Sequence, residues 1–283
     1  MCLINLDGSI FPSKQLETIR NELDSLNKKE REEYRNINAE KISKCDASKI
    51  VIVSGPGTGK SYLFLSRISH WFEQTQDARI LVTSFVRKLV TDLDNDVQLS
   101  PKFTEDDKKK TTVITLHKLA RSHVERNHGT SSWRFQSYFV MLGEWKVMFW
   151  NDVRAFHEKC DPSEYTLKGI EHQMYEDSFN KDPHWQSLKQ TYFRLCKFYN
   201  SSGFADLIIR AKVATQENSL LNDRTHFIVD EYQDFNQAEQ NLILELIKDS
   251  KSVLIVGDDE QVLYEDLKAG RRQLIRDLYQ DKQ

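Results

Sequence analysis

The sequence predicts an α/β fold in which helices cover both faces of a parallel sheet. Five short runs rich in Val, Ile and Leu have the length and the continuous apolar character of buried strands. Helix-forming sequence separates each run from the next, which is typical of repeated strand and helix units. The predicted strands lie at residues 50–53, 80–82, 113–114, 227–229 and 253–256.

A polar segment follows each predicted strand, and these segments form the candidate site. In chain order they read SGPGTGKS, TSFVRK, TLHKLA, DEYQD and GDDEQ. Ligands of open parallel sheets bind at the carboxyl ends of the strands. We therefore expect segments that lie far apart in the sequence to converge on one edge of the sheet.

Residues 121–202 are longer than an ordinary connection between two strands. They predict a mainly helical subdomain, inserted into a domain formed by residues 1–120 and 203–283. Aromatic residues interleaved with Lys and Arg suit either the core of this insert or a stacking platform for single-stranded bases. The insert holds four of the chain's five tryptophans, Trp133, Trp145, Trp150 and Trp185.

The segment at residues 13–48 is highly charged and predicts an amphipathic helix packed on the domain. Leu16, Ile19, Leu23 and Leu26 recur at helical spacing. The run KKEREE would form the solvated face of that helix.

Composition limits the class of protein. A length of 283 residues is enough for one large domain or two smaller ones. Without a signal peptide or a membrane-length apolar run, the sequence predicts a soluble protein with no membrane partner. The net charge of -3 gives no global attraction to nucleic acid, so DNA binding would need local patches.

The cysteines predict a reduced, cytoplasmic protein, because they are far apart and form no C-x-x-C pair. They are Cys2, Cys45, Cys160 and Cys196. A metal site built from Cys160, His157 and His172 is an alternative use of one of them.

The stretch SGPGTGKS predicts a phosphate-binding loop. Its glycines let backbone N–H groups approach phosphates closely, and the N-terminus of the next helix adds partial positive charge. Lys60 would neutralise β- and γ-phosphate oxygens, and the Ser61 hydroxyl would bind Mg²⁺. The strict loop pattern begins with glycine, where this chain has serine. The predicted nucleotide-binding residues are Ser54, Gly55, Pro56, Gly57, Thr58, Gly59, Lys60 and Ser61.

The stretch HFIVDEYQD predicts a strand that ends in two adjacent carboxylates. Asp230 suits a magnesium ligand, and Glu231 suits a base that activates water. An Asp-Glu pair after a strand can also be plain surface charge. Together with the glycine-rich loop, however, the pair predicts an enzyme that binds and hydrolyses a nucleoside triphosphate.

These segments resemble, in the same order, the motifs of the UvrD/Rep-like superfamily 1 DNA helicases. DEYQD and VGDDEQVLY are similar to the Walker B segment and the coupling motif of that family. TSFVRK resembles T-F-T-N-K, TLHKLA resembles T-F-H-S-F-A, and GFADLI resembles D-F-D-D-L-I. The resemblance covers about residues 37–270. It implies a P-loop NTPase domain of the RecA-like type, with the tryptophan-rich insert where the family carries a helical subdomain.

The resemblance also implies ATP and Mg²⁺ as cofactors and assigns roles to the residues that match. Gln233 and Gln261 would sense the γ-phosphate and relay its loss. The nucleotide and magnesium chemistry would belong to Lys60, Ser61, Asp230 and Glu231.

Three further residues would contact DNA, namely Phe85, Lys88 and His117. The alternative uses are a packed aromatic ring for Phe85 and a hydrogen-bonded histidine for His117.

The chain departs from the family at several positions. INAEK at residues 37–41 corresponds to L-N-P-E-Q, whose glutamine reads adenine, and Lys41 in that place puts adenine selectivity in question. Asp266 and Leu267 stand where the family has a stacking aromatic residue and an arginine. A carboxylate neither stacks on a base nor attracts phosphate, so a weaker grip on DNA is expected there.

A second RecA-like domain is also expected from the family, because its arginines stabilise the transferring phosphate and such an arginine is worth about 10³ to 10⁵ in rate. The sequence ends at Gln283 without one. Arg271 and Arg272 match no such motif.

Three function classes follow from these observations, and the first is favoured. It is the ATP-binding half of a DNA helicase or translocase, which acts on single-stranded DNA or on DNA with a single-stranded end. This half would need a second RecA-like domain, in the same chain or from a protein partner. The second class is a nucleotide-gated regulatory subunit of a defence or repair complex, for example one that controls a nuclease. The third, a small-molecule P-loop kinase, needs neither DEYQD nor GDDEQ.

Overall fold

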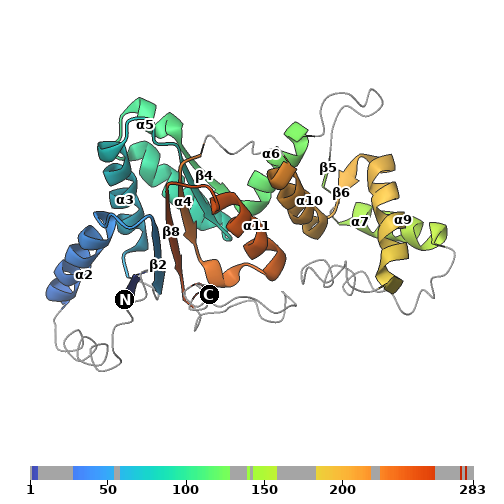
Figure 1. Cartoon of the computed structure of the whole chain (residues 1–283), viewed down its shortest axis with the longest axis horizontal. Coiled ribbons are helices and arrows are strands. Elements are labelled where there is room, and N and C mark those ends of the chain that lie inside the picture. Colours follow the sequence, from blue (N-terminus) through green and yellow to red (C-terminus); the bar gives the residue numbers. More distant parts are fainter. Residues whose placement is uncertain are drawn as a thin grey trace.

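The computed structural model describes residues 2–5, 28–53, 58–127, 139–140, 143–157, 183–217, 224–258, 275 and 278. The main sheet and its covering helices form the larger part, and a smaller helical part lies toward one end of the longest axis (Figure 1).

All of the predicted strands are present, and they run parallel in one sheet. The spatial order is β2-β8-β7-β3-β4. Their bounds are Lys49–Val53 (β2), Ile80–Ser84 (β3), Thr111–Thr115 (β4), His226–Asp230 (β7) and Ser252–Gly257 (β8). The predicted α/β fold with a parallel sheet is therefore confirmed.

A further strand, β1 (Cys2–Asn5), pairs antiparallel with β2 at the edge of this sheet. The sequence analysis did not predict it. Its place in the sheet depends on pairing with β2, which is a tertiary contact.

Successive residues of each strand pack into different cores on the two faces of the sheet, as the two-residue period of a strand requires. In β8, Val253 and Ile255 belong to one hydrophobic cluster. Leu254 and Val256 belong to the other. Because both faces are buried, β3, β7 and β8 contain continuous apolar runs, and this is why the sequence revealed them. The edge strand β4 is only partly buried and has a shorter apolar run.

One face is covered by α2 (Lys28–Ser43), α3 (Lys60–Gln74) and α4 (Arg87–Leu99). The short helix α5 (Glu105–Lys110) leads directly into β4. The core of this face includes Ile42 from α2 and Trp71 from α3, both almost fully buried.

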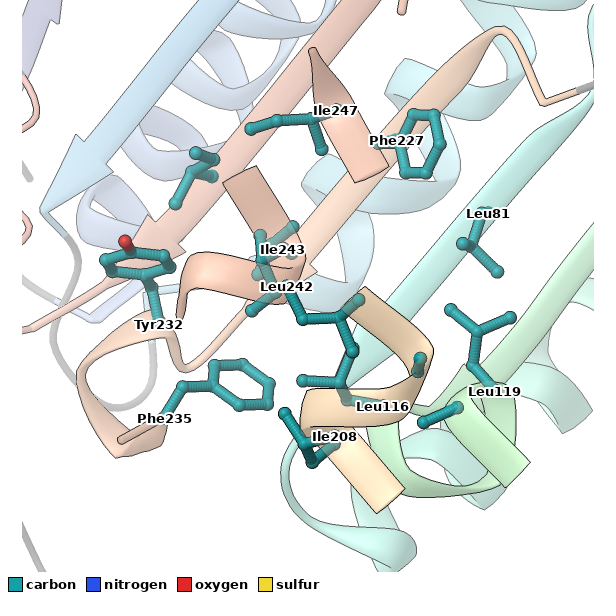
Figure 2. Close-up of a cluster of buried hydrophobic side chains, with 14 of the residues drawn as sticks. Leu81, Leu116, Leu119, Ile208, Phe227, Tyr232, Phe235, Leu242, Ile243 and Ile247 are labelled. Atoms are coloured by element: carbon teal, nitrogen blue, oxygen red, sulfur yellow. The ribbon is translucent and has the colours of Figure 1, made fainter. Parts of the chain in front are cut away.

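The opposite face is covered by α6 (Leu116–Asn127), α10 (Phe204–Glu217) and α11 (Gln237–Ile247). Figure 2 shows side chains from all three helices packed together with Tyr232 and Phe235, which follow β7. This cluster therefore joins the helices to the turn at the end of a central strand.

The smaller part contains α7 (Glu144–Phe156), α9 (Pro183–Tyr199) and a two-stranded sheet of β5 (Phe139–Val140) and β6 (Ser201–Ser202). Its own cluster includes Trp150, Phe149 and Tyr192, so core packing is confirmed for Trp150. Trp145 is 65% exposed. Trp133 and the side chain of Trp185 lie outside the described residues.

Helix α10 serves both parts of the molecule. Leu207 and Ile208 belong to the core beneath the sheet. Ala205 and the partly buried Ile209 pack with the cluster of the smaller part. The GFADLI segment thus joins the two cores, while the division into residues 1–120 with 203–283 and 121–202 stays a prediction.

Polar contacts reinforce this junction. The Gly203 N–H donates to the Tyr192 hydroxyl at 3.2 Å, and the Arg210 guanidinium donates to Asp206 at 2.9 Å. The Cys196 thiol lies 3.9 Å from the same carboxyl group. Burial raises the pKa of Asp206 to about 6, and Arg210 acts in the opposite direction.

Some of the sequence predictions concern residues outside the described part of the chain. The apolar face predicted for the N-terminal helix is one of them, since it consists of Leu16, Ile19, Leu23 and Leu26. Helix α2 itself lies within the segment predicted to be helical. Cys160 and His172 lie outside as well. Among the described side chains, Cys45 and Cys196 carry free thiols. No helix in the described part of the chain is long and apolar enough to cross a membrane.

Arg67 fastens the end of α2 to the sheet, which leads to a first prediction. Its guanidinium donates to the carbonyl oxygens of Ser43 and Cys45 at 2.8 and 2.5 Å, and to Ser252 Oγ at 3.2 Å. Arg67→Met leaves these acceptors buried without their donor, so it should lower the free energy of unfolding by about 3 kcal/mol. Chemical denaturation measures this, and Arg87→Met, on the exposed side of α4, is the matched control. An equal loss in both variants would contradict the prediction.

A second prediction concerns the pH dependence of the α10 junction. The pKa of Asp206 is above its ordinary value, so its ionisation in the folded state costs stability as the pH rises toward 6. Arg210→Met removes the nearby positive charge and should raise that pKa further. The variant should therefore lose more stability at about pH 8 than at about pH 5. Thermal unfolding at the two pH values checks this. In the double variant Asp206→Asn, Arg210→Met, the stability loss should be the same at both pH values, because no carboxyl group titrates at position 206.

Candidate functional site

The carboxyl ends of the parallel strands form one rim, as the sequence predicted. Ser84 at the end of β3 is in register with Asp230 of β7 on one side and with Thr115 of β4 on the other. At the end of β8, Gly257 is in register with Val53 of β2. The segments that follow these strands consequently start side by side.

The described part of the glycine-rich loop leads into the first turn of α3. Gly59 has a left-handed backbone, with φ of 82° and ψ of 30°, and its carbonyl accepts the first bond of the helix from the Leu63 N–H. Glycine adopts that conformation without the steric cost of a Cβ atom. Lys60 is the first helical residue, and Ser61 is exposed beside it. Residues 54–57 lie outside the description, so the predicted roles of Ser54, Gly55, Pro56 and Gly57 stay predictions.

The turn after β7 holds an unusual backbone. Glu231 has φ of 51° and ψ of 48°, a left-handed conformation that costs a non-glycine residue about 1 to 3 kcal/mol. A short 3-10 helix, η1 (Tyr232–Asp234), follows it. Tyr232 and Phe235 are fully buried in the core shown in Figure 2. Burial of these two rings on the C-terminal side of Glu231 holds the turn in place.

Three charged side chains meet at this turn. Lys60 Nζ lies 2.5 Å from Glu231 Oε1 and 3.9 Å from Asp230 Oδ1. The Glu231 N–H donates to Asp230 Oδ1 at 2.9 Å. The structure thus brings together the lysine of the loop and both carboxylates of DEYQD, although the loop and DEYQD are 171 residues apart.

Asp230 is poised to gain from a nearby cation. Its pKa is raised to about 7, first because the carboxyl group is buried and second because Glu231 is close, while Lys60 acts in the opposite direction. A positive ion beside this carboxyl group would stabilise its ionised form. Among the described residues, no group of three His, Cys, Asp or Glu side chains could hold a metal by themselves.

Gln233 lies next to the three charged residues. Its Nε2 donates to Glu231 Oε2 at 2.7 Å, and its Oε1 accepts from the Asp258 N–H at 2.9 Å. Gln261, the other predicted sensor of the γ-phosphate, lies outside the described residues.

The residues predicted to contact DNA lie after β3 and β4. Lys88 is exposed in the first turn of α4. Phe85 is half-buried and meets the edge of Phe235, with ring centroids 6.0 Å apart. His117 Nε2 lies 3.4 Å from Glu239 Oε1, and its ring is 5.1 Å from that of Phe204. Phe85 and His117 therefore have protein contacts, and their DNA contacts stay predictions.

Glu239 is a residue that the sequence analysis missed. It is 1% exposed, and it forms a capping box with Asn236 at the start of α11, with distances of 2.8 and 3.0 Å. The spacing Asn-x-x-Glu before an apolar run is a readable signal of such a box. Its contact with His117 has no local sequence signal, because the two residues come from different helices.

The sequence profile of the UvrD/REP helicase N-terminal domain matches residues 35–283. The chain belongs to the UvrD/Rep helicase family. A probable DNA helicase II homologue of Mycoplasma genitalium is 27% identical over 252 residues, which cover 78% of this chain and 35% of that protein. DNA helicase II of Escherichia coli is 25% identical over 262 residues, with 86% and 34% covered. The chain spans about a third of the length of these curated relatives.

The same relation extends to a third relative. The ATP-dependent DNA helicase Rep of Buchnera aphidicola is 24% identical over 235 residues, covering 76% of this chain and 35% of that protein. Membership in the UvrD/Rep family, together with the parallel sheet, confirms the predicted fold class of a RecA-like P-loop domain.

Of the departures from the UvrD/Rep motifs at Lys41, Asp266 and Leu267, only Lys41 lies in the described part of the chain. Lys41 is exposed in the last turn of α2, at the position where the family motif has glutamine. Asp266, Leu267, Arg271 and Arg272 lie outside the described residues.

A third prediction tests the capping box beside His117. Glu239→Ala removes the acceptor of the Asn236 N–H, so it should lower the free energy of unfolding by about 1 kcal/mol. Glu239→Gln keeps an oxygen acceptor and should lose less. Equilibrium unfolding in urea compares the two variants, and equal losses would show that the box does not stabilise α11.

Proposed function

We propose that the chain is the ATP-binding part of an ATP-dependent DNA helicase or translocase. The observation that carries this proposal is the convergence of Lys60, Asp230 and Glu231 at the carboxyl rim of a parallel sheet, in a chain of the UvrD/Rep family. Family membership favours this function over that of a nucleotide-gated regulatory subunit.

The triphosphate would lie at the N-terminus of α3. Backbone N–H groups and the partial positive charge of that terminus suit phosphate oxygens. Lys60 would leave Glu231 and bind β- and γ-phosphate oxygens, because a triphosphate offers more negative charge than one carboxylate. The contact between Lys60 and Glu231 would therefore belong to the nucleotide-free state.

Release of Lys60 would free Glu231 Oε1 to act as a base. A water oxygen would attack the γ-phosphorus while Glu231 accepts a proton from that water. The bond between the γ-phosphorus and the bridging oxygen would break, with ADP as the leaving group and inorganic phosphate as the second product.

Mg²⁺ fits the donor set of the site. Magnesium prefers oxygen ligands and is usually held by one or two protein groups together with waters and phosphate oxygens. Asp230 offers a buried carboxylate next to Glu231, and Ser61 offers an exposed hydroxyl. When bound, the ion would neutralise charge on the β- and γ-phosphates.

Single-stranded DNA would be the second ligand, and Phe85, Lys88 and His117 would contact it. A second RecA-like domain, in cis or in trans, would complete the ATP site. Three relatives named as DNA helicases support DNA as the ligand.

The experiment compares ATP binding and hydrolysis, with and without single-stranded DNA and co-purifying partners. Lys60→Ala should abolish tight ATP binding, because it removes the cation proposed to bind the β- and γ-phosphate oxygens. Glu231→Gln should retain ATP and lose about 10² to 10⁴ in turnover, because a carboxamide cannot accept the proton.

Unchanged hydrolysis in Glu231→Gln would remove Glu231 from the role of base. ATP binding without turnover in the parent protein, even with DNA and partners present, would count against a motor. Strong DNA-stimulated turnover of the isolated chain would show that no second domain is needed.

A further inference from the structure

Both polar atoms of the Gln233 side chain bind within the protein. Nε2 donates to Glu231 Oε2, and Oε1 accepts from the backbone of Asp258. Gln233 is only 4% exposed. The side chain therefore spans from the turn after β7 to the end of β8.

Gly257 provides the space for this bridge. A Cβ atom at Gly257 would lie 2.5 Å from Gln233 Oε1, closer than real Cβ contacts allow, 3.1 Å from Ile275 Cδ1 and 3.2 Å from the Tyr232 backbone nitrogen. The backbone φ of Gly257 is not in the left-handed region that demands glycine. Lack of space, most of all beside Gln233, and not backbone freedom favours glycine at the end of β8.

We propose that Gln233 is a positioning residue for the Glu231 carboxylate, and that Gly257 is its necessary neighbour. This inference rests on the proposed role of Glu231 as the base. The resemblance to the helicase motifs predicted that Gln233 senses the γ-phosphate. In the structure its amide ties Glu231 to the first aspartate of the GDDEQ segment, and the sensing of the γ-phosphate stays a prediction.

The bridge gives the two oxygens of Glu231 separate functions. Gln233 holds Oε2, while Oε1 lies against Lys60. When Lys60 turns toward phosphate, Oε1 becomes available to water, and Gln233 prevents the carboxylate from following the lysine. Through the two hydrogen bonds of Gln233, a movement of Glu231 would also move the backbone of Asp258. Asp258 lies three residues before Gln261, the other predicted γ-phosphate sensor.

Two substitutions separate the two halves of the bridge. Gln233→Met has a similar length and removes both hydrogen bonds. Gln233→Glu keeps an acceptor for the Asp258 N–H but places a carboxylate oxygen where the donor to Glu231 was. The matched control is Gln237→Met, since Gln237 is only half-buried and donates to Asn241 within α11.

The first measurement is amide hydrogen exchange at Asp258 in the nucleotide-free protein, followed by NMR. Gln233→Met should accelerate exchange about tenfold, because a buried hydrogen bond worth about 1.4 kcal/mol is lost. Gln233→Glu and Gln237→Met should exchange like the parent protein. Unchanged exchange in Gln233→Met would overturn the bridge, whatever the outcome for ATP.

The second measurement is turnover together with ATP affinity, in the presence of DNA and partners. Both Gln233 variants should lose about 10 to 100-fold in kcat and change the Kd for ATP by less than about threefold, the pattern of a lost transition-state contact. An unchanged kcat in Gln233→Met would overturn the positioning role. Failure of the parent protein to bind or hydrolyse ATP would contradict the proposed function. The hydrogen-exchange measurement would then test the hydrogen bonds of Gln233 by itself.

A double-mutant cycle tests Gly257. Gly257→Ala alone should lower kcat about as much as Gln233→Met, and it should cost less in a Gln233→Ala background, where the nearest clashing oxygen is gone and only the contacts with Ile275 and Tyr232 remain. Additive losses would show that Gly257 is needed for some reason other than Gln233.

Discussion

The left-handed backbone at Glu231 is the constraint on which the site depends. A non-glycine residue keeps this conformation only where its surroundings impose it. Tyr232 and Phe235, both fully buried between the sheet and the helices α6, α10 and α11, provide that constraint. The turn then brings both carboxylates within reach of Lys60. A hydrophobic cluster on one face of the sheet thus fixes the charged chemistry at its rim.

The same turn connects to the surface proposed to contact DNA. Phe85 meets the edge of Phe235, and His117 reaches Glu239 at the start of α11. Two of the three residues proposed to contact DNA, Phe85 and His117, therefore touch the segment that follows Glu231. Such shared contacts would let the nucleotide site and the proposed DNA contacts influence one another, because an element that contacts both sites can respond to both.

Sequence reasoning succeeded where the pattern is local. The central strands were predictable because burial on both faces gives them continuous apolar runs, and the glycine-rich loop was predictable because its residues are adjacent. The strand β1 was missed because its place in the sheet depends on pairing with β2. Glu239 was missed although its capping spacing is local, and its contact with His117 depends on how α6 and α11 pack. The role first expected of Gln233 came from resemblance, whereas its two hydrogen bonds come from the structure.

By itself, the sequence determined the fold class, the order of the strands along the chain and the residue types that could bind a nucleotide. Only the tertiary structure decided which of these residues meet. The pairing of Lys60 with Glu231, of Gln233 with Asp258, and the lack of space beside Gly257 follow from the spatial order and register of the strands. The hydrophobic period and the motif spacing of a segment indicate its local secondary structure. Contacts between distant segments depend on long-range packing, which a local sequence pattern does not predict.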